Sequence, residues 1–224
     1  MNTSVIIVCA GNSTRMNGVN KILLPLGESN VIGCSMLAFE RCESVKEIIV
    51  VCRPQDEDEI RKTAGKAGIT KLAAVAYGSD SRQKSVINGL RKINKGTEII
   101  AVHDGARPLV KPEHIELVIK NASVFGGSTL GVSVKDTIKV VNDELVVDTP
   151  HRPSLYITQT PQAFRRTLYF EAVDFALEHE LDFTDDCQLV EAVGGKIYMT
   201  TGDYKNIKIT TPEDIKIAEI LWEA

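Results

Sequence analysis

Two cations and a glycine lie close together near the start of the chain. The segment VCAGNSTRMNGVNK, residues 8–21, follows the apolar run SVIIV and contains Gly11, Arg15 and Lys21. A glycine loop after a buried strand lets backbone amides approach a phosphate, and two fixed cations can hold several negative charges together. The pattern therefore predicts a polyphosphate ligand, and a triphosphate fits it well.

This opening loop matches neither of two common nucleotide-binding templates. A dinucleotide fingerprint needs repeated glycines, whereas the residues after the first glycine here are Asn12, Ser13 and Thr14. The acidic residue expected after the second strand of that fold is replaced by residues 52–54, CRP. The spaced glycines and the Gly-Lys-Ser/Thr of a P-loop are also missing from the sequence. These departures argue against a nicotinamide dehydrogenase and against a P-loop enzyme.

The elements that must position these residues alternate along the chain. Short runs rich in β-branched residues are separated by longer stretches with helical spacing of apolar side chains. The runs are SVIIVCA, EIIVVC, KLAAVA, TEIIAVH, STLGVSV and KIYMT. Apolar strands separated by helices form a mainly parallel sheet that is covered by helices. With 224 residues and 43% hydrophobic content, the chain is predicted to be a single α/β domain over residues 1–224.

Polar loops follow three of the predicted strands. The first is the glycine loop, the second is YGSDSRQKS at residues 77–85, and the third is HDGARP at residues 103–108. The carboxyl ends of parallel strands meet at one edge of a sheet, and ligands bind at that edge. We therefore expect the three loops to converge on one site.

Residues 135–160 are predicted to leave this layered body as an arm. The stretch alternates apolar and polar residues around NDE, as a β-hairpin does, and lacks the helix of a parallel unit. A hairpin of this size is too small to have its own core, so we expect it to pack on a second copy of the chain. An edge hairpin folded on its own sheet is the alternative.

The C-terminal part returns to the α/β pattern. The segment FTDDCQLVEAVGG predicts a helix capped by Thr184 and ended by the glycine pair at 194–195. A short strand, IKI, and a helix that begins with the capping box of residues 211–214 follow. In that strand Lys208 points away from its flanking isoleucines and so faces a cleft or water.

Composition limits the partners and the compartment. The net charge of −4 gives no basic excess, which argues against a nucleic-acid partner. No run of about 18 apolar residues suggests a membrane span, and no export signal is recognisable. The five cysteines are scattered without CxxC spacing, as expected for reduced, buried thiols in a cytoplasmic protein.

Several motifs together resemble one enzyme family. The pattern A-G-x-x-x-R-M, followed by a lysine ahead of x-x-L-P-L, is typical of nucleotidyltransferases that activate sugar or polyol phosphates. Here it is matched by Ala10, Gly11, Arg15, Met16, Lys21, Leu24, Pro25 and Leu26. The motifs SRQKSVINGL, VHDGARP, KDTIK, QTPQAF, TDD and IKITTPED then resemble the 2-C-methyl-D-erythritol 4-phosphate cytidylyltransferase family in order and spacing. The similar ribitol 5-phosphate cytidylyltransferases share most of them, which leaves the acceptor open.

This resemblance implies a fold, a reaction and a homodimer. The fold is the Rossmann-like, nucleotide-diphospho-sugar transferase type, and the reaction joins CTP to a small polyol phosphate with release of pyrophosphate. In the homodimer, the arm of one subunit donates acceptor-binding residues to the neighbouring site. The attacking oxygen belongs to a phosphate dianion, so the chemistry needs positive charge at the transition state rather than a deprotonated nucleophile.

The resemblance also implies a role for particular residues of this chain. The implied catalytic residues are Arg15, Lys21 and Lys208, with Asp104 as the ligand of a Mg²⁺ cofactor. Those implied to bind the nucleotide are Ala10, Gly11, Gly78, Ser79 and Ser85. Those implied to bind the acceptor are Arg107, Thr160, and, from the arm, Thr137 and Arg152. The role of Arg82 is left open.

Three positions depart from the family pattern, and one rival function remains. Ser13 and Tyr77 stand where glycine is frequent, and Tyr156 stands where tryptophan is usual. None of these changes removes a charged group. The rival from another class is a non-catalytic, nucleotide-binding regulator, against which the intact charged positions argue.

Overall fold

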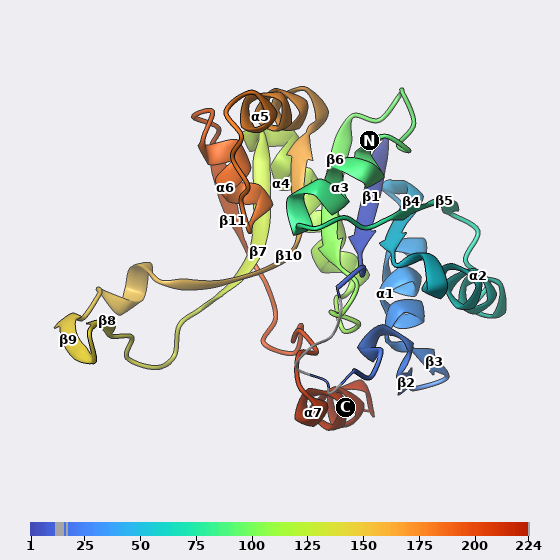
Figure 1. The fold of residues 1–224 in the computed structure, drawn as a ribbon, viewed down its shortest axis with the longest axis horizontal. Coiled ribbons are helices and arrows are strands. Elements are labelled where there is room, and N and C mark those ends of the chain that lie inside the picture. The colour runs from blue at the N-terminus through green and yellow to red at the C-terminus, as the bar shows by residue number, and fades with distance from the viewer. Residues whose placement is uncertain (12–15, 17, 224) are drawn as a thin grey trace.

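The computed structural model describes residues 1–11, 16 and 18–223. A central sheet with helices on both faces forms the body, and a long arm projects from it (Figure 1). The strand order in the sheet is β11-β7-β10-β6-β1-β4-β5. The strands are Thr3–Val8 (β1), Val45–Cys52 (β4), Leu72–Tyr77 (β5), Ile99–Asp104 (β6), Gly127–Ser133 (β7), Tyr156–Arg165 (β10) and Ile197–Thr201 (β11).

The sheet is mainly parallel, as the sequence predicts. Strand β1 pairs in parallel with β4 and β6, β4 pairs in parallel with β5, and β7 pairs in parallel with β11. Strand β10 is antiparallel to both of its neighbours, β6 and β7. The six predicted runs correspond to β1, β4, β5, β6, β7 and β11. The prediction missed β10, which begins inside the range expected for the arm.

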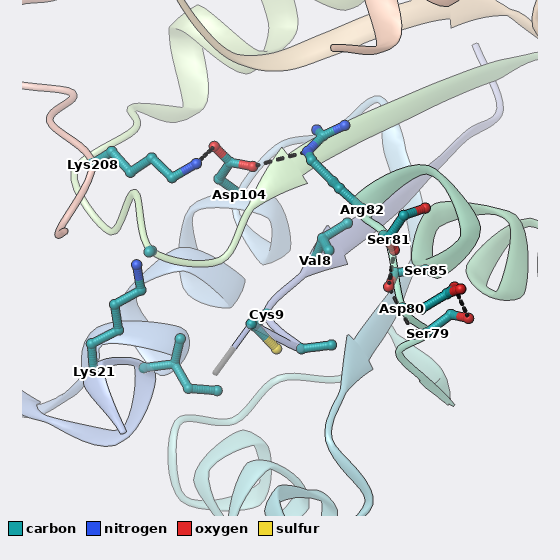
Figure 2. A pocket seen from close by; sticks show the side chains of 14 residues that line it. Val8, Cys9, Lys21, Ser79, Asp80, Ser81, Arg82, Ser85, Asp104 and Lys208 are labelled. Carbon is teal, nitrogen blue, oxygen red and sulfur yellow. Dashed lines mark hydrogen bonds and ion pairs between the residues drawn. The ribbon is translucent and has the colours of Figure 1, made fainter. Parts of the chain in front are cut away.

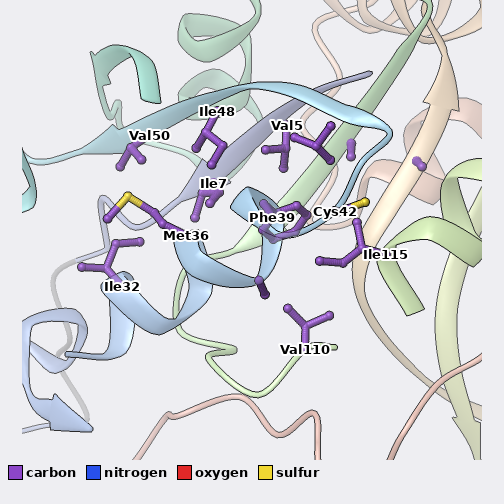
Figure 3. Close-up of a cluster of buried hydrophobic side chains, with 14 of the residues drawn as sticks. Val5, Ile7, Ile32, Met36, Phe39, Cys42, Ile48, Val50, Val110 and Ile115 are labelled. Carbon is purple, nitrogen blue, oxygen red and sulfur yellow. The ribbon is translucent and has the colours of Figure 1, made fainter. Parts of the chain in front are cut away.

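Two apolar layers cover the two faces of the sheet. On one face lie α1 (Val31–Glu40), α2 (Glu57–Lys66) and α4 (Pro112–Phe125), and on the other lie α3 (Arg82–Leu90), α5 (Arg166–Glu178) and α6 (Asp186–Glu191). Successive side chains of β1 point alternately into the two layers. Val5 and Ile7 pack in the first, around Phe39 of α1 (Figure 3), while Ile6 packs in the second. Burial on both faces explains why the strands read as continuous apolar runs.

The arm consists of the chain between β7 and β10. It carries the predicted hairpin, with β8 (Val140–Asn142) paired to β9 (Leu145–Asp148). The turn residues Asp143 and Glu144 both have positive φ, 47° and 66°, as a two-residue hairpin turn of type I′ requires. The arm ends earlier than the predicted range of 135–160, because Tyr156–Thr158 already pair with β7 in the sheet.

Two details of the C-terminal part differ from the sequence prediction. The N-cap of α6 is Asp185 rather than Thr184, because the Asp185 carboxylate accepts from the Cys187 N–H at 2.8 Å. Residues 207–209 do not form a strand, and instead the Ile209 N–H donates to the Ala106 carbonyl oxygen at 2.9 Å. Lys208 still points away from buried Ile209, as predicted. The last helix, α7 (Pro212–Glu223), follows.

The cysteines are buried and reduced, as the sequence predicts. All five cysteines are buried and free, and burial raises the pKa of Cys34 to about 11, so that this thiol stays protonated near neutral pH. Among the described residues, no helix is both long enough and apolar enough to cross a membrane.

Two helix glycines provide a test of how closely α3 packs on the sheet. A Cβ on Gly89 of α3 would lie 2.7 Å from Ile6 Cγ2 and 2.9 Å from Val51 Cγ2, whereas a Cβ on Gly65 of α2 would meet nothing within 4 Å. Alanine in a helix interior gains about 1 kcal/mol over glycine, but overpacking costs about 1–3 kcal/mol. The difference predicts that Gly89→Ala lowers the free energy of unfolding by up to about 2 kcal/mol in urea titrations followed by circular dichroism.

The matched control is Gly65→Ala, which should raise the free energy of unfolding by about 0.5–1 kcal/mol. Equal stabilisation by both substitutions would show that α3 does not pack tightly on β1 and β4.

Candidate active site

A cavity of about 330 Å³ opens at the carboxyl edge of the sheet (Figure 2). The three polar loops converge there, as the sequence predicts. The cavity is lined by residues 8–11 after β1, residues 79–82 and Ser85 around the start of α3, Asp104 and Ala106 at the end of β6, and Lys21, Ile22 and Lys208. The three loops meet at one site because β1, β5 and β6 run parallel in one sheet and end at the same edge.

One wall of the cavity is formed by the predicted nucleotide-binding residues. Ala10, Gly11, Ser79 and Ser85 line the cavity, and Gly78 lies directly behind Ala10. A Cβ on Gly78 would overlap the Cβ of Ala10. The physical reason for a glycine here is therefore the close packing of two loops.

Ser85 holds the loop that precedes α3. Its hydroxyl accepts from the Ser79 N–H at 2.9 Å and donates to the Ser81 carbonyl oxygen at 2.8 Å. Ser81 is the N-cap of α3 and accepts from the Lys84 N–H at 3.2 Å. The loop conformation at this wall is therefore fixed by side-chain hydrogen bonds from the helix itself.

The carboxylate of Asp104 is the electrostatic centre of the cavity. Lys208 Nζ lies 2.8 Å from Asp104 Oδ2, Arg107 Nε lies 3.7 Å from the same oxygen, and Arg82 Nε lies 3.6 Å from Oδ1. Burial alone would raise the pKa of Asp104, but the charges of Lys208, Arg82 and Arg107 outweigh burial and hold the pKa well below its usual value. Asp104 is therefore ionised throughout the physiological range.

Arg82 is shared between two carboxylates. Its Nη1 lies 2.5 Å from Asp186 Oδ2, in addition to the contact of Nε with Asp104, and Asp186 also accepts from the Tyr169 hydroxyl. Burial would lower the pKa of Arg82, but Asp186 and Asp104 raise it above its usual value. The sequence left Arg82 open and did not indicate Asp186 as its partner. The TDD motif was the available signal, but a contact between positions 104 residues apart is not visible in sequence spacing.

Hydrogen bonds that involve Thr160 and His103 hold the backbone at Asp104 in place. The Thr160 hydroxyl accepts from the Asp104 N–H and lies 3.0 Å from His103 Nδ1, while His103 Nε2 lies 3.1 Å from the Arg107 carbonyl oxygen. Because a carbonyl oxygen only accepts, Nε2 carries the proton and Nδ1 accepts from Thr160. Burial lowers the pKa of His103 to about 4, so the ring is neutral. Thr160, expected to bind the acceptor, is buried and bonds to the backbone of Asp104.

Arg107 lies beneath the cavity rather than in its lining. Its side chain is 12% exposed, and its Nη1 donates to the Asn206 carbonyl oxygen at 2.9 Å. It therefore joins the end of β6 to the segment that carries Lys208. Arg107, which the resemblance implies to bind the acceptor, instead lies beside Asp104 and supports the backbone around it.

The two lysines reach the cavity from different ends of the chain. Lys21 begins the short 3-10 helix η2 (Lys21–Leu23), and Lys208 precedes α7. Figure 2 shows the Lys21 side chain extending toward the side of the cavity where Lys208 and Asp104 lie. Arg15, the other predicted catalytic cation, and Ser13 lie outside the described residues.

The two predicted arm residues do not line this cavity. Thr137 and Arg152 are exposed on the arm, which extends away from the body (Figure 1). Arg152 Nη1 donates to the Lys135 carbonyl oxygen at 3.2 Å, within the arm. Tyr77 is 50% exposed and donates to Glu57 at 2.7 Å, and Tyr156 is 48% exposed at the start of β10.

Cations held in place around a buried carboxylate can bind and polarise phosphate groups. Lys21, Lys208 and Arg82 present positive charge to the cavity, and the backbone of residues 10–11 lies opposite. Low local dielectric strengthens such charges, and fixed positions let them act without reorganisation in a phosphoryl-transfer transition state. The arrangement suits the transfer of a nucleotidyl group between phosphates.

Comparison with known proteins agrees with this chemistry. The family model of 2-C-methyl-D-erythritol 4-phosphate cytidylyltransferase (IspD) matches residues 3–224. A protein of that name from Caldanaerobacter subterraneus subsp. tengcongensis is 45% identical over 223 residues, which cover 98% of this chain and 98% of its own. Another from Geobacillus kaustophilus is 41% identical over 222 residues, covering 99% of this chain and 97% of its own.

Solved structures give the same result. The crystal structure of the 4-diphosphocytidyl-2C-methyl-D-erythritol synthase from Anaerococcus prevotii has a TM-score of 0.87 at 32% identity, covering 99% of this chain and 96% of its own. That of the 2-C-methyl-D-erythritol 4-phosphate cytidylyltransferase from Thermus thermophilus has a TM-score of 0.81 at 28% identity, with complete coverage of both chains. Sequence, fold and cavity thus agree over almost the whole length, and the chain belongs to the 2-C-methyl-D-erythritol 4-phosphate cytidylyltransferase family of nucleotidyltransferases.

Proposed function

We propose that this chain transfers the cytidylyl group of CTP to 2-C-methyl-D-erythritol 4-phosphate. The products are 4-diphosphocytidyl-2-C-methyl-D-erythritol and pyrophosphate, in the non-mevalonate route to isoprenoid precursors. The observation that carries the proposal is the charged set of Asp104, Lys21 and Lys208 in one cavity of a chain of this family. This set also argues against a non-catalytic regulator, and the names of the relatives do not favour ribitol 5-phosphate as acceptor.

In the proposed mechanism, a phosphate oxygen of the acceptor attacks the α-phosphorus of CTP, and the bond to the pyrophosphate oxygen breaks. The acceptor phosphate is already ionised, so no side chain has to remove a proton. Lys21 and Lys208 stabilise the negative charge that grows on the α-phosphate and on the leaving pyrophosphate. Arg15 is proposed to act with Lys21, by the family pattern alone.

The residues present fit a Mg²⁺ cofactor held mainly by its substrate. Within the described ranges, no group of three or more His, Cys, Asp or Glu side chains gathers as a metal site. Asp104 offers one ionised carboxylate in the cavity, and Mg²⁺ is commonly bound by one or two carboxylates together with phosphate oxygens and water. When bound, the ion would neutralise phosphate charge, and Asp104 would supply its carboxylate ligand.

We propose further that the arm joins two copies of the chain. Large apolar side chains on the hairpin are exposed, including Val141 at 55%, Leu145 at 71% and Val146 at 59%. Apolar side chains gathered on a hairpin that has no core of its own are typical of a surface buried by a partner. The exposed Thr137 and Arg152 would then contribute to the acceptor site of that partner. A cytoplasmic location is proposed from the free, buried cysteines.

The acceptor is tested by supplying CTP and Mg²⁺ with each candidate phosphate in turn and measuring pyrophosphate. We expect release with 2-C-methyl-D-erythritol 4-phosphate and less than about 1% of that rate with ribitol 5-phosphate, since unpaired polar groups in a site reject a wrong acceptor by roughly 10⁴-fold. Faster release with ribitol 5-phosphate would reverse the assignment of the acceptor. No release with either would favour the regulator.

Removing either cavity lysine should slow turnover. We expect Lys21→Ala and Lys208→Ala each to lower kcat by about 10²-fold or more, because each loses a fixed donor to the transition state. Lys62→Ala, which removes a lysine that is 57% exposed on α2, serves as the control and should keep normal turnover. Steady-state pyrophosphate release measures all three, and normal turnover in both cavity variants would refute the assigned roles.

Removing the arm guanidinium should weaken acceptor binding. We expect Arg152→Ala to raise the KM for the acceptor by about 10-fold or more and to leave the KM for CTP nearly unchanged, since a bidentate guanidinium matches phosphate geometry. Lys139→Ala on the same arm, where Nζ bonds to Thr149, is the control for charge loss. Mixed dimers of Arg152→Ala and Lys21→Ala subunits should regain activity, and no recovery in verified heterodimers would contradict a shared site.

A further inference from the structure

A third apolar cluster lies outside the two layers that cover the sheet. Its buried members are Leu26, Val31, Cys34, Ile209 and Ala218, and Leu24, Leu109, Ile207 and Ile215 pack against them. We call these nine residues the C-terminal cluster, because α7 closes it. The three segments that bring Lys21, Asp104 and Lys208 to the cavity all contribute to it.

Each of these segments places an apolar side chain in the cluster a few residues from its charged side chain. Lys21 is followed by Leu24 and Leu26, and Lys208 is flanked by Ile207 and Ile209. The loop that begins at Asp104 continues to Leu109. The positions of these charges therefore depend on one apolar contact region as well as on the sheet.

Helix α7 packs against Leu24 and Leu26 in the C-terminal cluster. It also contacts the segment that follows Lys21 at a second place. That segment forms the small hairpin β2 (Pro25–Leu26) and β3 (Ser29–Asn30), whose turn contains Gly27 at a φ of +57°. A Cβ on Gly27 would lie 2.7 Å from Trp222 Cε2. The indole of Trp222 thus lies directly against this turn.

The start of α7 is fixed to the segment of Lys208. Asp214 accepts from the Thr210 N–H at 2.7 Å and from the Thr211 N–H at 2.9 Å, which is the capping contact that the sequence predicts. The Thr210 hydroxyl donates to the Lys208 carbonyl oxygen at 3.0 Å. The helix therefore connects Lys208, at its beginning, to the turn after Lys21, near its end.

We propose that α7 acts as a clamp that sets the spacing of the Lys21 and Lys208 ammonium groups. Trp222 is then a positioning residue, which acts through these lysines and does not touch substrate. The inference rests on the proposed catalytic role of the two lysines. A displacement of about 1 Å can lower a rate by 10²-fold when catalysis depends on preorganised groups.

The clamp can be loosened without disturbing the sheet. The two apolar layers of the sheet contain no residue of α7 among their described members, and Trp222 itself is 41% exposed. The outer side of the same helix carries Ile220, which is 68% exposed. Ile220→Ala is therefore a matched control that shortens an apolar side chain on α7 without touching the turn.

The first experiment compares Trp222→Ala, Trp222→Phe and Ile220→Ala in the whole chain. We expect Trp222→Ala to lower kcat by about 10-fold and to change the KM for CTP by less than about 3-fold, since misplaced lysines affect the transition state most. Trp222→Phe should restore most of the rate, because an aromatic ring again covers Gly27. Ile220→Ala should match the unmodified chain. Unchanged kcat in Trp222→Ala, or an equal loss in Ile220→Ala, would overturn the clamp.

A double-mutant cycle separates positioning from general loss of structure. In a Lys21→Ala background, Trp222→Ala should lower kcat by less than about 2-fold more, because Trp222 contacts the turn that follows Lys21 and that lysine is already gone. Losses that multiply in full would show that Trp222 acts independently, and would overturn the inference. Normal turnover in Lys21→Ala alone would instead refute the proposed role of that lysine, whereas an impaired Lys21→Ala with a normal Trp222→Ala refutes only the clamp.

Discussion

The ionised carboxylate of Asp104 holds the site together. Lys208, Arg82 and Arg107 lie within 3.7 Å of it and come from three different segments. Cations at this density would repel one another without a central counter-charge, and a buried carboxylate without partners would cost several kcal/mol. The loop after β6, the start of α3 and the segment before α7 are therefore held together by one anion.

The histidine beside this anion, His103, is uncharged. His103 is completely buried beside Asp104, and its neutral ring can accept from Thr160 while it donates to the Arg107 carbonyl oxygen. A charged imidazole could not accept that hydrogen bond. Burial thus keeps the histidine neutral, and neutrality lets it join β10 to the loop that presents Asp104 and Arg107.

Much of this structure was predictable from local sequence patterns, and the remainder depends on contacts between distant segments. Apolar runs predict six strands, most clearly the central ones such as β1 and β6, which are buried on both faces, and NDE predicts the hairpin turn. Strand β10 was missed because its first residues lie in the range assigned to the arm and Pro161 interrupts its run, since proline is rare inside a central strand. Asp186 could not be assigned as a partner of Arg82, since that ion pair depends on how α6 packs beside α3. Thr160 and Arg107 were expected to bind the acceptor, and only the structure shows that they form hydrogen bonds with the backbone groups of Asp104 and Asn206.

The reversed direction of β10 has a consequence for how the family can diversify. Because β10 is antiparallel to β6 and β7, its first residue lies at the carboxyl edge, where β7 ends. The arm between them must therefore leave the body at the same edge as the cavity, on a segment with almost no share in the two buried layers. If the arm selects the acceptor as proposed, its sequence can change to fit a different polyol phosphate. Such changes need not affect the loops that line the cavity or the stability of the sheet.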